Sequence, residues 1–420
     1  MEVRPGYKQT EVGVIPEDWA CTTICRLASP VRNAIVGGPF GSDLVSKDYV
    51  DDGVPVVRGQ NMAGRLVSGE FAFVTHAKAT SLQANLAHPG DLVFTQRGTL
   101  GQVSLVPQQP YARYLISQSQ MKLTVNPRLA DPFFFYYVFT SAEQQESIRK
   151  GTIQTGVPHI NLGILRALHV QRPSLIEQKA IAEALSDADV FIESLEQLLG
   201  KKRQIKEGAM QELLIGKKRL PGFRGEWEMK LLGKIAQLRN ERINPRRSER
   251  HEFCIELEHI EQGTGHIAGS TEISESSSLK SVFRKNDVLF GKLRAYLRKY
   301  WLADRDGLCS TEIWVLTAKP TLLIPEFLFQ LIQLDRFIQS ASSSYGTHMP
   351  RSDWSVVKNY ELRLPSVAEQ VAVAAILSDM DTEIDALHAK VAKARAIKQG
   401  MRQEVLTGRI RLVNATETMV

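Results

Sequence analysis

The chain has 420 residues, of which 43% are hydrophobic and 23% are charged, and this composition excludes a wholly disordered protein. The net charge of +6 permits a nucleic-acid partner without requiring one. No run of about 18 apolar residues occurs, and the N-terminus lacks the apolar core of a signal peptide. Together with only four cysteines, these features predict a cytoplasmic protein without a membrane partner.

The first part of the chain predicts a domain of mixed secondary structure. Residues 90–94 and 120–125 combine β-branched and aromatic residues between turn residues, which is typical of strands. Residues 131–150 start with Asp-Pro and become polar toward their end, which predicts one helix. Cys21 and Cys25 have a spacing that suggests a metal site, but no Cys/His pair completes it. We therefore expect these two thiols to be buried and inert.

Residues 174–220 predict a long helix with an apolar seam. Apolar residues recur at alternating spacings of four and three, which is the heptad pattern of a helix that packs against another helix. The seam residues are Ile181, Leu185, Ala188, Ile192, Leu195 and Leu199.

A second mixed domain and a second long helix follow. Residues 312–318 predict a strand, and residues 366–412 repeat the helical segment 174–220 without a gap, at an offset of 192. The seam keeps its register in the second copy, at Val373, Leu377, Met380, Ile384, Leu387 and Val391.

The repeat extends upstream of the helices. Residues 90–101 resemble residues 286–297, and residues 126–139 resemble residues 319–332. The sequence therefore predicts an α+β protein with two mixed α/β domains, separated by two long antiparallel helices in a pseudo-two-fold, circularly arranged chain. The expected boundaries are 1–172 for the first domain, 173–216 for the central helix, 217–364 for the second domain, 365–413 for the C-terminal helix and 414–420 for a tail.

Two interpretations of the long helices remain open. Each helix could cover only its own domain, or the two helices could pair with each other. We favour pairing, because a repeated domain–helix unit can close around a pseudo-two-fold axis and bring equivalent helices together antiparallel. A helix of about 35 residues is roughly 50 Å long, so such a pair could act as a spacer.

Motifs of common enzyme classes are missing from the sequence. No GxxxxGK[ST], HExxH or GxSxG pattern occurs. The stretch DPFF at 131–134 resembles the [ND]PP[FY] motif of adenine methyltransferases, but Phe133 replaces the required proline. Its counterpart IPEF at 324–327 has no acidic residue at the first position, which indicates a helix start rather than catalysis. The sequence thus predicts no catalytic and no metal-binding residues.

Polar clusters lie beside the predicted strand ends in both halves, and they differ between the halves while the surrounding framework matches. Arginine and lysine suit guanine edges, glutamine and asparagine suit adenine, and all of them can bind phosphate. This pattern favours two DNA-reading domains with different targets over simple solvated loops. In the first half the candidates are Arg58, Gln60, Asn61, Gln96, Arg97, Thr99 after Gly98, Gln118, Gln120, Gln154, Thr155 and His159. In the second half they are Arg246, Arg247, Lys292, Arg294, Tyr296, Arg298, Lys299, His348 and Arg351.

Over nearly its whole length the chain resembles the DNA-specificity subunit of type I restriction-modification systems. The resemblance rests on GYKQTEVGVIPEDW at the start, GGPFGSDL at 37–44, GDLVFTQRG at 90–98, HINLG at 159–163, and the doubled helices with the trailing LLIGKKRLPGFRGEW. One departure is THMPRSDW in the second half, which keeps the proline of GVPHINLG but not its Ile-Asn pair.

The resemblance implies a non-catalytic subunit with two target recognition domains, each reading one half of a split target in double-stranded DNA. It also implies that the paired helices dock two methyltransferase subunits, and that restriction and translocase subunits join through the complex. S-adenosylmethionine, ATP and Mg are then expected on the partner subunits, with no cofactor in this chain. Two alternatives remain open: a DNA-modifying enzyme, and a helical adaptor that does not bind DNA.

Overall fold

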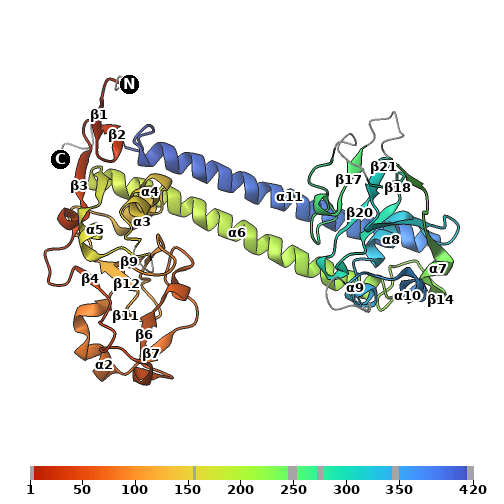
Figure 1. Cartoon of the computed structure of the whole chain (residues 1–420), viewed down its shortest axis with the longest axis horizontal. Coiled ribbons are helices and arrows are strands. Elements are labelled where there is room, and N and C mark those ends of the chain that lie inside the picture. The colour runs from red at the N-terminus through yellow and green to blue at the C-terminus, as the bar shows by residue number, and fades with distance from the viewer. Residues whose placement is uncertain (1–3, 155–157, 245–252, 272–277, 343–349, 414–420) are drawn as a thin grey trace. The chain divides into compact units, whose positions relative to one another are not determined.

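The computed structural model describes residues 4–154, 158–244, 253–271, 278–342 and 350–413. The chain divides into two compact units. Unit 1 comprises Met1–Ser194 together with Val391–Val420, and unit 2 comprises Leu195–Lys390. Each unit therefore contains one mixed domain and one part of each long helix, and Figure 1 labels the elements of both.

Unit 1 contains two main sheets and two strand pairs. The four-stranded sheet has the order β10-β9-β12-β4, and the five-stranded sheet has the order β5-β7-β6-β11-β8. The first sheet is formed by β4 (Ile35–Gly37), β9 (Leu92–Thr95), β10 (Val103–Leu105) and β12 (Gln120–Leu123). The second is formed by β5 (Tyr49–Val50), β6 (Val54–Val57), β7 (Ala72–Val74), β8 (Leu86–Ala87) and β11 (Tyr114–Ile116). The pairs are β1 (Tyr7–Thr10) with β2 (Gly13–Pro16) and β3 (Ala20–Thr23) with β13 (His169–Arg172).

In its described residues, unit 2 repeats this plan with fewer strands. Its sheets have the orders β15-β22-β19-β20 and β16-β18-β21-β17, and β14 pairs with β23. In both units one parallel pair occurs within the second sheet, β11 with β6 and β21 with β17. The bounds are β14 (Glu228–Leu231), β15 (Ala236–Leu238), β16 (Arg242–Ile243), β17 (Cys254–Ile255), β18 (Lys280–Phe283), β19 (Val288–Gly291), β20 (Tyr300–Leu302), β21 (Gly307–Ser310), β22 (Ile313–Ala318) and β23 (Glu361–Leu364).

Most short helices occur at equivalent positions in the two units. Those of unit 1 are α1 (Ile24–Leu27), α2 (His76–Ser81), α3 (Pro132–Phe139), α4 (Ala142–Lys150) and α5 (Leu162–Ala167). Those of unit 2 are α7 (Leu232–Ile235), α8 (Pro325–Leu331), α9 (Asp335–Ser342) and α10 (Trp354–Val357). The long helices are α6 (Leu175–Leu213) and α11 (Val367–Leu406). The duplicated α+β architecture confirms the predicted fold class, and the strands β9, β12 and β22 lie where the sequence predicts them.

The single helix predicted at 131–150 is wrong, because the structure divides it into α3 and α4. Asp131 caps α3 by accepting a hydrogen bond from the backbone N–H of Phe134 at 2.9 Å, with Pro132 in the first turn. Ser141 then caps α4 by accepting one from the N–H of Gln144 at 3.2 Å. The DPFF stretch is therefore a helix start, as the sequence analysis predicts.

The core of each domain lies between its first sheet and its helices. In unit 1, Phe94 of β9, Phe135 and Phe139 of α3 and Leu185 of α6 belong to one buried cluster. Figure 1 shows α3 and α4 beside the start of α6. In unit 2, Phe290 of β19, Phe327 and Leu328 of α8 and Leu377 of α11 form the equivalent cluster. The first residues of each predicted seam are thus part of a domain core.

The two long helices also run antiparallel within each unit. In unit 1, Val405 and Leu406 at the end of α11 share a cluster with Ile181 near the start of α6. In unit 2, Met210 and Leu213 at the end of α6 share a cluster with the start of α11. Both open interpretations therefore hold in part: each helix covers a domain, and the helices also pair.

One charged pair joins the helices at equivalent positions in both units. In unit 1, Lys398 forms an ion pair with Asp189, which also accepts a hydrogen bond from the Tyr137 hydroxyl at 2.7 Å. In unit 2, Lys206 pairs with Asp381 at 2.5 Å, and Gln330 donates to Asp381 at 3.1 Å. Further seam residues are buried at Ile192, Leu195, Leu199, Val373 and Val391, whereas Ile384 and Leu387 are half-buried.

A buried glutamate closes unit 1 by joining the beginning of the chain to its end. Glu177 of α6 accepts hydrogen bonds from the indole N–H of Trp19 at 3.0 Å and from Arg411 at 2.5 and 2.8 Å. The hydrogen bonds to Glu177 hold the pKa of the Arg411 guanidinium above its usual value. Arg411 also lies over the Trp19 ring and binds Asp18 at 2.7 Å. We call these residues closure 1.

Unit 2 contains the same cluster, built from the middle of the chain. Glu369 accepts hydrogen bonds from the indole of Trp227 at 3.2 Å and from Arg219 at 2.6 and 2.7 Å. We call these residues closure 2. Since the C-terminal Arg411 takes in unit 1 the place that Arg219 takes in unit 2, the chain is circularly arranged, as predicted.

The glutamine after each closure glutamate holds the domain to the helix. Gln178 donates to the carbonyl oxygens of Leu129 and Pro173, and Gln370 donates to those of Leu322 and Pro365. The repeated Glu-Gln pair in the sequence therefore has a structural role at the helix start.

The prediction of two buried thiols near the N-terminus is wrong. Cys25 is exposed and Cys21 is half-buried, with its thiol 3.3 Å from Glu11. Ile24 and Leu27 are the residues of α1 that enter the buried cluster of unit 1, so Cys25 between them lies on the exposed side of this short helix. Cys254 and Cys309 are buried.

Candidate functional site

The end of β9 in unit 1 joins three loops that contain predicted DNA-contacting residues. The backbone N–H of Gln96 donates to the carbonyl of Ser119 at 2.7 Å, and the N–H of Ile160 donates to the carbonyl of Gln96 at 3.1 Å. An isolated antiparallel bridge pairs Arg97 with His159. These bonds bring the loops 96–101 and 117–120 together with residues 158–160. We call this region strand-end site 1.

Unit 2 has the same arrangement at the end of β19. The N–H of Lys292 donates to the carbonyl of Glu312 at 3.0 Å, and the N–H of Ser352 donates to the carbonyl of Lys292 at 2.8 Å. An antiparallel bridge pairs Leu293 with Arg351. We call this region strand-end site 2.

The two strand-end sites share their backbone bonds but not their side chains. The bridge carries Arg97 and His159 in site 1, and Leu293 and Arg351 in site 2. Arg351 binds Glu312 at 3.1 Å, whereas site 1 has Ser119 at the place of Glu312. Exposed polar residues of site 1 include Thr99 and Gln118, and those of site 2 include Arg294 and Tyr296. The hydrogen-bonding groups offered to a ligand therefore differ between the two units.

A side chain at an equivalent position in each unit caps the short helix after the bridge. Asn161 accepts a hydrogen bond from the N–H of Ile164 at 2.9 Å and starts α5. Asp353 accepts one from the N–H of Ser355 at 2.8 Å and starts α10. The departure from the Ile-Asn pair in the second half thus keeps the helix cap, because aspartate caps as well as asparagine does.

Several predicted contact residues are committed to internal hydrogen bonds. Asn61 is 1% exposed, and its amide donates to the carbonyls of Ser68 and Glu70. Gln120 is also 1% exposed and accepts from the Ser117 hydroxyl. Lys299 donates to the carbonyl of Leu257 at 2.8 Å. Asn61 and Gln120 are thus buried groups that hold loops in place, and Lys299 uses one of its donors to hold the loop at Leu257.

Gln60 and Gln118 are exposed but also bind neighbouring loops. Gln60 donates to the carbonyl of Glu70 at 3.2 Å, and Gln118 donates to that of Leu44 at 2.7 Å. Arg58 is half-buried, and its Nε atom is buried without a hydrogen-bond partner among the described residues. Gln154 is exposed. The predicted residues Thr155, Arg246, Arg247 and His348 lie outside the described residues.

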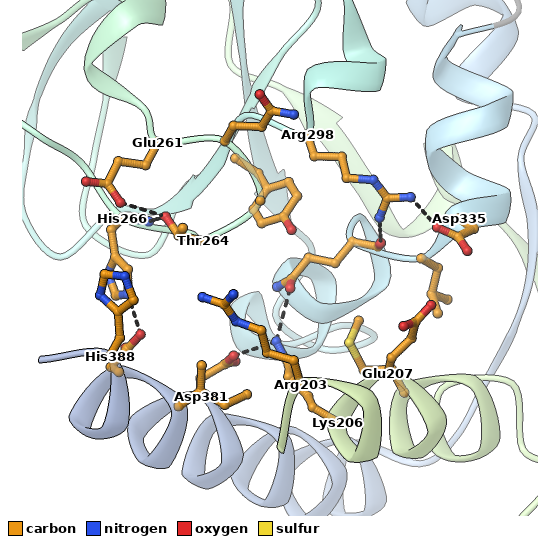
Figure 2. A pocket seen from close by; sticks show the side chains of 18 of the residues that line it. Arg203, Lys206, Glu207, Glu261, Thr264, His266, Arg298, Asp335, Asp381 and His388 are labelled. Atoms are coloured by element: carbon orange, nitrogen blue, oxygen red, sulfur yellow. Dashed lines mark hydrogen bonds and ion pairs between the residues drawn. The ribbon is translucent and has the colours of Figure 1, made fainter. Parts of the chain in front are cut away.

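Arg298 lines a cavity of about 410 Å³ within unit 2, and its side chain is 38% exposed (Figure 2). It forms an ion pair with Asp335 and donates to the carbonyl of Gln333 at 3.3 Å. Lys206 on the opposite side binds Asp381. Two cations of this cavity are therefore already neutralised by acidic partners, which disfavours phosphate binding there.

The cavity wall also includes a tyrosine that stays neutral. Burial raises the pKa of Tyr300 to about 12. His266 lies 2.9 Å from Asp385 of α11 and ties its loop to the helix. The arrangement of cavity residues is that of a structural joint between the second domain and the helices.

Sequence reasoning missed one exposed aromatic residue beside strand-end site 1. Phe40 is 82% exposed, and the loop that carries it is bound by Gln118, which donates to Gly41. A Cβ on Gly38 would lie 1.9 Å from the carbonyl oxygen of Ser117, so only glycine permits this close approach. The paired glycines before an aromatic residue in GGPFGSDL were a usable signal for an exposed, fixed loop.

Among the described residues, no group of three or more potential ligands is placed to hold a metal ion. Within the same residues, no helix is long and apolar enough to cross a membrane. The strand-end sites instead offer guanidinium, amide, imidazole and hydroxyl groups, whose hydrogen bonds suit base edges and phosphates.

Comparison with known proteins places these features in a family. The family described as type I restriction modification DNA specificity domain matches residues 44–207 and again residues 224–394. The MjaVIII specificity subunit of a type I restriction enzyme from Methanocaldococcus jannaschii is 23% identical over 71% of this chain and 75% of its own length. The EcoDI specificity subunit from Escherichia coli is 22% identical over 68% of this chain and 71% of its own length.

Solved structures share the fold at lower identity. The S subunit of a type I restriction-modification system from M. genitalium superposes with a TM-score of 0.59 at 16% identity, covering 96% of this chain and 98% of that one. A chain from a study of assembly and conformational transition of the type I system gives a TM-score of 0.52 at 15% identity, covering 94% and 99%.

Proposed function

Because the chain belongs to the family of type I restriction-modification DNA specificity proteins, we propose that it recognises a two-part target in double-stranded DNA and holds methyltransferase subunits there. The observation that carries this proposal is the duplicated strand-end site. Two domains with one backbone frame present different polar side chains at the same place. Such a pair is suited to reading two different half-sequences.

Chemical modification of DNA is assigned to partner subunits rather than to this chain. The polar groups of the strand-end sites are suited to hydrogen bonding, and Lys206 and Arg298 of the cavity described above are paired with carboxylates. We propose that S-adenosylmethionine, ATP and Mg act on the methyltransferase and restriction subunits, and that restriction and translocase subunits join through the methyltransferase.

The exposed face of α6 supports a protein partner. Val190 and Phe191 of unit 1 are at least half exposed, and Leu198 and Ile205 of unit 2 are exposed as well. Apolar side chains on a polar helix surface favour binding of another protein. We propose that two methyltransferase subunits dock on the long helices, with this apolar face of α6 in the contact.

Binding of the reconstituted complex to randomised duplexes tests the proposal. We expect selection of two short sequences separated by a fixed spacer, and methylated adenines within both. Equal binding to all duplexes would contradict sequence recognition. The absence of any DNA binding, with the protein complex intact, would favour the helical adaptor.

A further inference from the structure

The hairpins that follow β9 in unit 1 and β19 in unit 2 each contain two left-handed residues, but the residue types at these positions differ. In unit 1 the left-handed positions between β9 and β10 are Gly98 (φ 97°) and Gly101 (φ 87°). In unit 2 the left-handed positions between β19 and β20 are Arg294 (φ 54°) and Arg298 (φ 51°). Counting from the preceding strand places Arg294 at the position of Gly98.

An arginine at a left-handed position costs conformational free energy that glycine does not. Residues held in such conformations concentrate at functional sites, where another role maintains them. In the hairpin of unit 1 a glycine occupies the corresponding left-handed position. The side chains of the two arginines in unit 2 therefore need an explanation beyond the turn itself.

Arg298 has such an explanation within the protein. Its guanidinium binds Asp335 and the carbonyl of Gln333, and so fixes the hairpin to the start of α9 (Figure 2). This contact is structural, and the position needs no ligand to account for it.

Arg294 lacks such an internal role. It is exposed, and its guanidinium has no partner in the part of the chain that the structure describes. Its backbone, by contrast, is fixed: its N–H donates to the carbonyl of Pro350 at 2.9 Å, and its carbonyl accepts from Leu297 at 2.8 Å. The bridge between Leu293 and Arg351 lies directly beside it. A rigid backbone thus presents a free guanidinium at strand-end site 2.

We propose that Arg294 is a specificity-determining residue that reads a guanine in the half-sequence recognised by unit 2. An arginine can donate two hydrogen bonds to the O6 and N7 atoms of guanine in the major groove. A phosphate contact carries no sequence information and would serve both units alike, yet unit 1 has Gly98 and no side chain at this point. A residue present in only one of two readers fits a base contact.

This inference rests on the proposed function, and its test uses the full chain in complex with its methyltransferase subunits. Arg294→Gly is compared with Arg284→Gly, which removes an exposed arginine before the opposite end of β19. Binding to duplexes randomised in both half-sequences is measured at several salt concentrations, together with the melting temperature.

For Arg294→Gly we expect a loss of about 10- to 100-fold in preference for guanine at one position, with the other half-sequence read as before. The melting temperature should rise, because glycine relieves the left-handed backbone. Arg284→Gly should keep the guanine preference.

Uniform weakening over all sequences, with the salt slope reduced by about 0.9, would show a phosphate contact and overturn the inference. An unchanged preference with a lower melting temperature would show a structural role and overturn it too. Failure of the proposed function is distinguishable, since the unaltered complex would then select no sequence at all.

Discussion

Closure 1 allows a sharp prediction about stability, because a single buried carboxylate joins both ends of the chain to α6. We replace Glu177 by leucine, which keeps the approximate volume and removes the charge. The Trp19 indole N–H then loses its acceptor at 1% exposure, a loss that costs about 1–3 kcal/mol. Arg411 loses two charge-assisted hydrogen bonds but keeps Asp18 and is about one-quarter exposed.

Breaking a fully buried ion pair costs about 3–5 kcal/mol, and the partial exposure of Arg411 places this change at the lower end. We expect a loss of about 3 kcal/mol, which corresponds to roughly a 150-fold fall in hydrogen-exchange protection. The fall should be confined to unit 1, at β3, β13 and the first turns of α6. Hydrogen exchange measured by peptide mass spectrometry gives the protection of each segment separately, whereas a single unfolding curve would average both units.

Two further variants serve as controls for closure 1. Glu177→Gln keeps an acceptor for Trp19 but no charge, so its loss should be smaller. Glu369→Leu should lower protection in unit 2 by a smaller factor, since Trp227 is only half-buried. A change below about threefold in unit 1 for Glu177→Leu, or an equal fall in both units, would refute the reasoning.

Three other predictions follow from the same structure. A circular permutant that links residue 420 to residue 1 and opens the chain between Gly222 and Phe223 should fold, because closure 2 would then be formed by chain ends as closure 1 is here. On the proposed function it should also retain DNA recognition by the complex. Loss of exchange protection in both units would contradict this. Unfolding free energy should fall as pH rises from about 10 to 12, because the unfolded state releases its tyrosine protons first while burial keeps Tyr300 protonated up to about 12. In urea titrations, the Tyr300→Phe variant should lose less unfolding free energy over this pH range. The same pH dependence in the variant and the unaltered protein would contradict the role of Tyr300. On the proposed function, four-residue insertions after Leu199 and after His388 should lengthen the spacer between half-sequences by roughly two base pairs; methylome sequencing checks this, and altered half-sequences would argue against a shared spacer.

The periodicity of the long helices predicted their existence and their pairing, but not what each seam residue contacts. A heptad spacing indicates that an apolar helix face packs against a partner, and that partner can be another helix or a domain. Ile181 and Leu185 fulfil the pattern by entering a domain core, and Lys206 and Lys398 contribute charged pairs beyond the apolar seam. The gapless offset of the repeat was the stronger signal, since it required equal geometry in both copies.

The strand-end sites were predictable as regions but not as individual side chains. Composition cannot tell a polar residue that holds a loop from one that faces a ligand, so Asn61 and Gln120 looked equal to Arg97. The left-handed backbone of Arg294 was also hidden, because arginine at that position gives no turn signal of the kind that Gly98 gives. The φ angle of Arg294 in the structure reveals it.

The equivalence of the two closures also has a consequence for inheritance. Each closure ends its helix with a left-handed glycine, Gly216 or Gly408, against the tryptophan of the next domain. A domain that fits one closure thus meets the same chemical partners at the other. Genetic exchange within the coding sequence of the repeated helices can therefore replace one domain by another while the surrounding packing is retained. On the proposed function, such an exchange of whole domains would change the target sequence and keep the contacts of both closures.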